Sequence, residues 1–511
     1  MGDSDPWTFP SGRSRLGHVP LRVPVSPRLR VILLIGAGVR AEHLNDDRLG
    51  RVLDQLYLSG LTQLFVSIAL KAAKQMGVAT DRFHLDSSSF HVHGEYEPMS
   101  PELRVVRKTA SSTEEESDNQ ATPKPIHITY GYSRDHRPDL KQFIIDLICS
   151  GDGDVPLYLR VSDGNEADKA MFAQLILEFR QQLDWEAWIV ADSALYTADN
   201  LKSLQGVRWI SRVPLTIAEA KRLVDSLSAD EFVATQLVGY RIASKSSQYA
   251  GVEQIWVIVE SQARKQADIK QLHGSLEKLE QRLNQQLVQL CLTDFRCEAD
   301  ALLAADRFAN KLKFHELQAL TVIKHTHHAK PGRPRKDAQP SCVNYRLQAT
   351  LVRNQDAVQK ASACSGRFVL AANRIDSAQL SAEQVLQHYK EQQSPERGFR
   401  FLKDPLFFTS SVCLKSPERV AALAFVMGLC LLIYSLGQRQ LRHALVEAGD
   451  SINNQLGKAT QRPTLRWVFQ CFQDVHLLHL DQLKQVVNLT PLRQHILRFF
   501  GTPCRQYYLL L

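Results

Sequence analysis

The stretch that decides the fold is Phe83-His84-Leu85-Asp86-Ser87-Ser88-Ser89-Phe90-His91-Val92-His93-Gly94. Its apolar residues tend to recur at every second position, which is typical of a half-buried β-strand. Asp86 lies inside this strand, where a charged side chain is costly unless it is paired or bound. The stretch therefore predicts a strand that carries a functional carboxylate, with an ordinary cap or turn residue as the alternative.

Further strands and helices are expected on both sides of this stretch. Two helices fit residues 45–78, with a break at Ser59-Gly60. Residues 143–149 and 155–161 predict a hairpin, because Gly and Asp between them supply turn conformations. A helix at 167–183, a strand at 187–191, a helix at 197–204 and a strand at 207–213 follow. The second candidate carboxylate, Asp192, comes directly after the 187–191 strand.

The composition describes a folded protein and names no function. The chain has 511 residues, 44% hydrophobic and 23% charged, with a net charge of +8 and a pI near 8.9. These values exclude a disordered or collagenous chain, and they permit a polyanionic partner without requiring one. The nine cysteines never show Cys-x-x-Cys spacing, which argues against a zinc ribbon or disulfide framework and favours a cytoplasmic location.

The remaining segments suggest an interrupted core. Strands are expected at 255–260 and 367–372, and a leucine stripe from Ile269 to Leu290 predicts a helical hairpin or arm within one chain. The apolar run Val420–Leu436 predicts a buried core helix rather than a membrane span. The expected parts are a poorly ordered lead-in (1–40), a helical N-terminal region (41–80), the first part of the core (81–214), an insertion domain (215–378), the second part of the core (379–440) and a helical C-terminal region (441–511).

A third candidate carboxylate lies in Tyr389-Lys390-Glu391-Gln392-Gln393-Ser394-Pro395-Glu396-Arg397-Gly398-Phe399-Arg400-Phe401-Leu402-Lys403. Tyr389, Glu396 and Lys403 recur every seven residues, so on one continuous helix they share a face. A solvated charged face is the alternative. Pro395 disfavours a helix interior, so the helix can instead begin there with Ser394 as N-cap, which separates Tyr389 from Glu396.

These segments resemble the DDE transposases of bacterial insertion sequences. Asp86, Val190-Ala191-Asp192-Ser193-Ala194 and Tyr389-x2-Gln392-x3-Glu396-x6-Lys403 carry the resemblance. The last of them is similar to the Tyr-x2-Arg-x3-Glu-x6-Lys signature of the IS-four superfamily. A long-insert branch of it is suggested by the stretches at 43–50, 131–140, 398–405 and 463–467, and the whole resemblance covers about residues 41–500.

The resemblance implies an α/β fold: a ribonuclease H-like mixed sheet interrupted by a large α+β insertion, with helical N- and C-terminal regions. It implies that Asp86, Asp192 and Glu396 hold two Mg²⁺ ions, with Mn²⁺ as a substitute, for DNA cleavage and strand transfer. The partners would be transposon ends and target DNA, with a homodimer in the active complex and no membrane. The implied DNA-binding residues are Tyr389, Gln392 in place of the signature arginine, Arg400 and Lys403.

A further basic motif, Lys330-Pro331-Gly332-Arg333-Pro334-Arg335-Lys336, resembles an AT-hook core. Arg333 and Arg335 would then contact the minor groove of DNA, with a solvated linker as the alternative. Two other functions stay open. One is a catalytically impaired DNA-binding remnant or regulator, suggested by Gln392 and Pro395. The other is a ribonuclease H-like nuclease without strand transfer.

Overall fold

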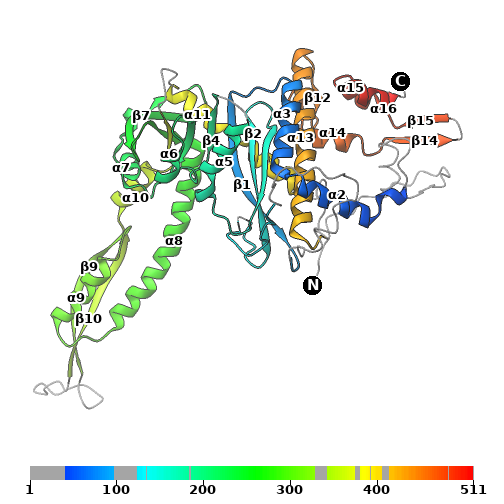
Figure 1. Cartoon of the computed structure of the whole chain (residues 1–511). Coiled ribbons are helices and arrows are strands. Elements are labelled where there is room, and N and C mark those ends of the chain that lie inside the picture. The colour runs from blue at the N-terminus through cyan, green and yellow to red at the C-terminus, as the bar shows by residue number, and fades with distance from the viewer. Residues whose placement is uncertain are drawn as a thin grey trace, which may run out of the picture.

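A mixed nine-stranded sheet runs through the body of the computed structural model, in the order β3-β2-β1-β4-β5-β11-β8-β7-β6 (Figure 1). The structure describes residues 41–96, 123–133, 135–182, 186–327, 342–373, 380–391, 393–404, 414–480 and 483–509. The strands are β1 Arg82–Val92, β2 Lys141–Ser150, β3 Pro156–Ser162, β4 Trp188–Ala191, β5 Arg208–Val213, β6 Val233–Ala234, β7 Tyr240–Tyr249, β8 Val252–Ser261 and β11 Arg367–Asn373. The lead-in at 1–40 lies outside the described residues.

The strand directions divide the sheet into two halves. β1, β2 and β3 are antiparallel neighbours, whereas β1, β4 and β5 run parallel. β11 is antiparallel to both β5 and β8, through pairs such as Val369↔Val213 and Val369↔Ile258. Every predicted strand from the 83–94 stretch to 367–372 is present.

Strands from the expected insertion domain (215–378) extend the core sheet, which differs from a fully separate insertion. β11 is buried along its whole length, and it hydrogen-bonds to β5. An unpaired β5 edge would leave backbone groups unsatisfied, and pairing with an apolar strand removes that cost. The chain therefore leaves the sheet after β8, forms an arm and returns to the sheet at β11, next to β8.

Helices cover both faces of the sheet, because side chains on a strand alternate between its faces. Phe83 of β1 meets Phe179 of α5 (Asp168–Gln182) with ring centroids 5.2 Å apart. Phe90, on the other face of β1, meets Phe399 of α12 (Gln393–Leu402) at 6.5 Å. That second face is also covered by α11 (Ala382–Lys390), whose Val385 packs among buried residues of β4, β8 and β11.

The N-terminal helices are α2 (Asp46–Leu58) and α3 (Leu61–Gln75), as the sequence predicts. Asn45 caps α2, and Gly60 adopts a φ of 77° at the break, a conformation that favours glycine. Arg419 of α13 (Pro417–Glu447) binds the buried carboxylate of Asp54 through two nitrogens, at 2.8 and 3.0 Å. This ion pair ties the first helix to a segment more than 350 positions further along the chain.

The apolar run at 420–436 lies in α13, whose residues pack into the core, as predicted. By length and composition α13 could cross a membrane, and so could the pair α2 and α3 if their 86° bend were one span. In α13, 61% of the most apolar window is buried inside the protein. This burial among the described residues is typical of a core helix, as the sequence predicts for residues 420–436.

An arm projects from the sheet between β8 and β11 (Figure 1). It consists of α8 (Gln262–Leu292), α9 (Glu298–Ala309), β9 (His315–His327) and β10 (Cys342–Arg353), and α10 (Gln355–Ala363) leads back to the sheet. The apolar side of α8 packs on β10, where Leu290 and Cys291 meet Leu347. The leucine stripe thus forms an arm within one chain, as predicted, although α8 packs mainly on a β-hairpin rather than on a second helix.

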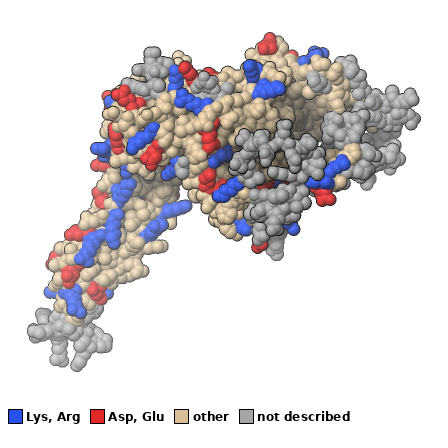
Figure 2. All heavy atoms as spheres, viewed as in Figure 1, with Lys and Arg blue, Asp and Glu red and all other residues tan. Residues whose placement is uncertain are grey.

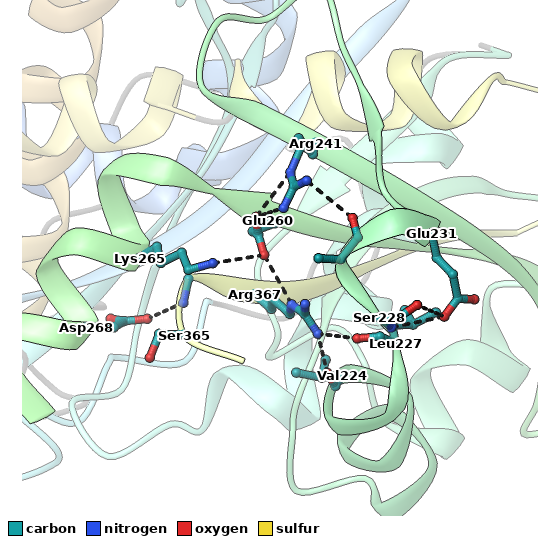
Figure 3. A network of polar contacts seen from close by, with 12 residues as sticks. Val224, Leu227, Ser228, Glu231, Arg241, Glu260, Lys265, Asp268, Ser365 and Arg367 are labelled. Carbon is teal, nitrogen blue, oxygen red and sulfur yellow. Dashed lines mark hydrogen bonds and ion pairs between the residues drawn. The ribbon is translucent and has the colours of Figure 1, made fainter. Parts of the chain in front are cut away.

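The base of the arm is held by a polar network around Glu260 (Figure 3). Glu260 accepts hydrogen bonds from Arg241 at 3.2 Å and Arg367 at 3.3 Å, and Lys265 of α8 lies 3.5 Å away. Arg367 also donates to the carbonyl oxygens of Val224 and Leu227. Because one carboxylate joins β7, β8, β11 and α8, the direction of the arm relative to the sheet is set at its first turn.

The C-terminal region contains short hairpins as well as the predicted helices. Its elements are β12 Ile452–Asn453, β13 Ala459–Thr460, α14 Leu465–Cys471, β14 His476–Leu480, β15 Leu483–Val487, α15 Pro491–Leu497 and α16 Thr502–Leu509. The other short elements are η1 Ala41–Leu44, α6 Ala198–Ser203, α7 Ala218–Ser226 and η2 Ala229–Glu231.

Candidate active site

Asp86 and Asp192 occupy matching positions on neighbouring strands. β1 and β4 are parallel, and their last registered pair is Leu85↔Ala191. Leu85 is followed by Asp86, and Ala191 is followed by Asp192. Adjacent strands of a sheet lie only about 4.8 Å apart. The sheet therefore brings together two carboxylates that are 106 positions apart in the sequence (192 minus 86).

Backbone hydrogen bonds orient both aspartates. The amide of Ser87 donates to Oδ1 of Asp86 at 2.8 Å, and the amide of Ala194 donates to Oδ1 of Asp192 at 2.8 Å. The Ser211 hydroxyl of β5 donates to the Asp192 carbonyl at 2.7 Å, which fixes the turn after β4. Both side chains are half-buried, so they remain in reach of a ligand from solvent.

Helix α12 lies over the face of β1 that carries Asp86. Leu147 is the residue of β2 directly opposite Asp86, and paired residues point to the same face. The Leu147 side chain lies 3.3 Å from where a Cβ on Gly398 would stand, so the helix approaches the sheet closely at this point. Glu396 is on this helix and is exposed, one turn before the buried Phe399.

Tyr389, at the end of α11, is a buried residue of the candidate site. Burial raises its pKa to about 12, and the charges of Asp192 and Glu396 add to this rise, opposed by Arg212 and Arg264. The charges of both carboxylates and both guanidinium groups therefore act on the tyrosine hydroxyl. Tyr389 also meets Phe368 with ring centroids 6.4 Å apart.

Arg212 and Arg264 are site residues that the sequence did not identify. Their guanidinium carbons lie 5.6 and 5.8 Å from the centre of the Phe368 ring. Arg212 comes from β5, and Arg264 comes from the first turn of α8, far away in the sequence. No local spacing links them to Tyr389. Only their positions beside the candidate carboxylates, at a site expected to bind phosphates, could have identified them.

Of the two alternatives for residues 389–403, the single continuous helix is wrong. α11 ends at Lys390 and α12 begins at Gln393, so Tyr389 and Glu396 belong to different helices. Pro395 lies in the first turn of α12, where a missing backbone N–H is tolerated. The alternative of a new helix near Pro395 is therefore correct, although it begins two residues before Pro395.

The other predicted DNA-binding residues have separate locations. The Lys403 ammonium lies 2.7 Å from the Asp135 carboxylate and 5.3 Å from the centre of the Phe90 ring. Arg400 is exposed on α12. Gln392, Arg333 and Arg335 lie outside the described residues.

Two of the three candidate carboxylates are placed so that they could bind a hard divalent cation together. Carboxylate oxygens are the ligands that Mg²⁺ and Mn²⁺ prefer, and Asp86 and Asp192 stand side by side. Among the described residues, however, no three His, Cys, Asp or Glu side chains are grouped closely enough to hold a metal ion. Asp86 and Asp192 therefore fit a metal as a pair, while the part of Glu396 stays a prediction.

The end of α11 is fixed to β1 beneath the site. Arg82 of β1 forms an ion pair with Glu391, and His388 lies on the same last turn of α11. Burial, helped by the charge of Arg82, lowers the pKa of His388 to about 4. The histidine is thus neutral in the folded protein at neutral pH.

We expect His388 to make the protein sensitive to mild acid. Between about pH 6.5 and 4 the unfolded chain binds a proton at this residue that the folded chain does not, so the stability of the folded protein decreases as the pH is lowered. In His388→Gln, the thermal midpoint should fall less between pH 7 and pH 5 than in the wild type. The same substitution at the exposed His273 of α8 serves as control, and equal falls in wild type and His388→Gln would refute the expectation.

The chain is similar to known proteins in sequence and in structure. The family described as "Transposase DDE domain" matches residues 80–433, and "Domain of unknown function (DUF4277)" matches residues 28–70. No curated protein matches the chain.

Among solved structures, a piggyBac transposase synaptic complex with hairpin DNA is similar over 83% of this chain and 58% of its own, with 9% identity and a TM-score of 0.31. A Mos1 transposase paired-end complex with left transposon end is similar over 32% of this chain and 42% of its own, with 11% identity and a TM-score of 0.15. The chain thus spans little more than half the length of the piggyBac chain that it matches.

The resemblance of the sequence to DDE transposases is confirmed by the match to the first of these families. The matched segment, residues 80–433, begins just before β1 and ends within α13. It therefore contains Asp86, Asp192 and Glu396, as well as the whole arm. Since it makes up more than half of the chain, the chain belongs to the family of transposase DDE domains.

Proposed function

We propose that this protein is a DNA transposase that cleaves DNA at the ends of an insertion sequence and joins the freed 3′ ends to target DNA. The observation that carries the proposal is the placement of Asp86 and Asp192 at matching positions of two parallel strands, within the segment that matches the family. Two carboxylates on rigid neighbouring strands can hold divalent metal for phosphoryl transfer.

The proposal includes a ribonuclease H-like core of the IS-four type. Its support is the strand order β3-β2-β1-β4-β5, in which three antiparallel strands are followed by two that run parallel to β1. In the sequence, the arm and the strands β6, β7, β8 and β11 lie between Asp192 and Glu396, the second and third candidate carboxylates. That is the place where the resemblance expects an insertion.

In this proposal each residue has a defined role. Asp86 and Asp192 would hold Mg²⁺ or Mn²⁺, and Glu396 would complete the site from α12. A metal held there would polarise the scissile phosphate and activate the attacking hydroxyl. Arg212 and Arg264 attract the phosphate beside Tyr389, and Lys403 and Arg400 hold the neighbouring backbone. The protein thus contributes position and electrostatic stabilisation.

The partners follow from the reaction. Transposon ends and target DNA are the substrates, and a homodimer would hold two ends together. The proposed location is the cytoplasm.

The test is cleavage by the purified full chain. A plasmid that carries its gene with the flanking DNA is incubated with and without Mg²⁺, and nicks are mapped by primer extension. Metal-dependent nicks at two flanking positions, followed by joining of the 3′ ends to a second plasmid, are expected. Nicks without joining would favour the nuclease alternative, and binding without nicks would favour the regulator.

We expect Lys403 to be a phosphate contact that exchanges Asp135 for DNA. Lys403→Met should weaken duplex binding and reduce the slope of log affinity against log salt by about one, the loss of a single phosphate contact. The measurement is fluorescence anisotropy at several salt concentrations. Lys74→Met, at the exposed end of α3, removes one charge elsewhere and should leave the slope unchanged. An unchanged slope in Lys403→Met would exclude this contact.

A further inference from the structure

One side of the arm helix α8 carries a continuous polar stripe. Its residues are Arg264, Gln271, Ser275, Lys278, Arg282, Gln285 and Gln289, and all of them are exposed. They follow one another at intervals of seven, four, three, four, three and four residues, which keeps them on one face of a helix. The stripe lies opposite the apolar side that packs on β10.

The stripe has the chemistry of a polyanion-binding surface. It contains three cations and four neutral hydrogen-bonding side chains. Asp268, on the same face, lies 3.7 Å from Arg264, and from Gln271 to Gln289 the stripe has no carboxylate. Two other arginines of the arm are ion-paired: Arg346 pairs with Asp294 at 2.6 Å and Arg353 pairs with Glu280 at 2.6 Å. Within the part of the chain that the structure describes, Lys278 and Arg282 form no ion pair. Figure 2 shows Lys and Arg side chains along the whole length of the arm.

The stripe begins at the candidate active site. Arg264 is its first residue, and the same guanidinium lies over Phe368 and acts on Tyr389. The Glu260 network fixes this first turn of α8 to the sheet (Figure 3). A duplex bound at the site beside Tyr389 can therefore continue along the arm, past the ion pair of Arg264 with Asp268, to Lys278 and Arg282.

The length of the stripe suits duplex DNA. Arg264 and Gln289 are 25 residues apart (289 minus 264), which at about 1.5 Å per residue gives roughly 38 Å. One turn of a DNA duplex is about 34 to 36 Å long. Side chains spaced along such a helix can reach phosphates over a full turn.

We propose that the Arg264–Gln289 stripe of α8 binds the backbone of the duplex DNA that leaves the active site. This inference rests on the proposed function, because it takes DNA as the substrate, and it adds a second contact region about one helical turn long. Lys278, Arg282 and the neutral side chains from Gln271 to Gln289 suit contacts to phosphates, which do not depend on base sequence.

The test compares single substitutions in the full-length protein. Lys278→Ala and Arg282→Ala should each reduce the slope of log affinity against log salt by roughly 0.9, and the double variant by roughly twice as much. The probe is a mixed-sequence duplex of about 40 bp, which covers roughly four turns. Lys270→Ala removes one exposed charge from another face of the same helix and should not change the slope.

A second measurement does not depend on the loss of charge. Photocrosslinking from benzoylphenylalanine at Gln285 should label the duplex, whereas the same group at Asn284, which is exposed and about 100° around the helix from Gln285, should not. Stripe variants that bind like Lys270→Ala, or equal crosslinking from both positions, would overturn the inference. If the wild type itself binds no duplex and shows no metal-dependent nicking, the proposed function fails instead, so the two failures are distinguishable.

Discussion

Asp86→Asn, Asp192→Asn and Glu396→Gln are each expected to reduce DNA cleavage by more than about a hundredfold, since even residues that only support metal ligands contribute 10- to 100-fold. The amide keeps the size of the side chain but removes the negative charge that a hard cation requires. Duplex binding should persist, because it depends on lysine and arginine contacts to phosphates.

The measurement is the initial rate of metal-dependent nicking, with binding followed separately by anisotropy. Asp199→Asn is a matched control, because Asp199 is an exposed acidic residue in the first turn of α6. Wild-type cleavage by Asp86→Asn or Asp192→Asn would refute the proposed metal pair. Wild-type cleavage by Glu396→Gln alone would leave that pair intact and remove Glu396 as the third ligand.

Gly428→Val should lower the free energy of unfolding by about 3 kcal/mol, as expected when extra methyl groups are forced into a filled core. A Cβ at this position would stand 2.3 Å from a methyl carbon of Leu159 and 3.1 Å from the ring of Phe65. Both neighbours are fully buried, so they have little room to move. The substitution would push α13 away from β3 and α3.

The free energy is measured by urea unfolding. Gly274→Val in α8 is the control, because nothing lies within 4 Å of its added Cβ and any change there reports the helix preference alone. If both variants have the same unfolding midpoint as the wild type, the close packing of α13 on β3 does not require a glycine at position 428.

Much of the fold follows from local patterns. The alternation around Asp86, the Gly and Asp turn before Val155 and the break at Gly60 each act over a few residues, so the strands and helices could be predicted one at a time. The resemblance to DDE transposases, which rested on short motifs, is confirmed by the family match. Between the two alternatives for residues 389–403, the seven-residue spacing could not decide, because such spacing persists even where a helix is interrupted.

The candidate site could be predicted only in part. Asp192 was recognisable because it ends a strand, and Asp86 because a charge inside an apolar strand needs a reason. Arg212 and Arg264 carry no such signal. They become site residues only when β5 and the start of α8 are placed beside Tyr389.

The sequence by itself determined most strands and helices of the core sheet, which acidic residues are candidates, and the family. The tertiary structure alone decided that β11 joins β5, that α8 packs on the β10 hairpin, and that Arg264 reaches Tyr389 from the arm. The physical reason is the range of the interactions. Periodicity, capping and turn chemistry act between near neighbours in the chain, whereas strand pairing and charge clustering join residues more than a hundred positions apart, and these depend on how the whole chain packs.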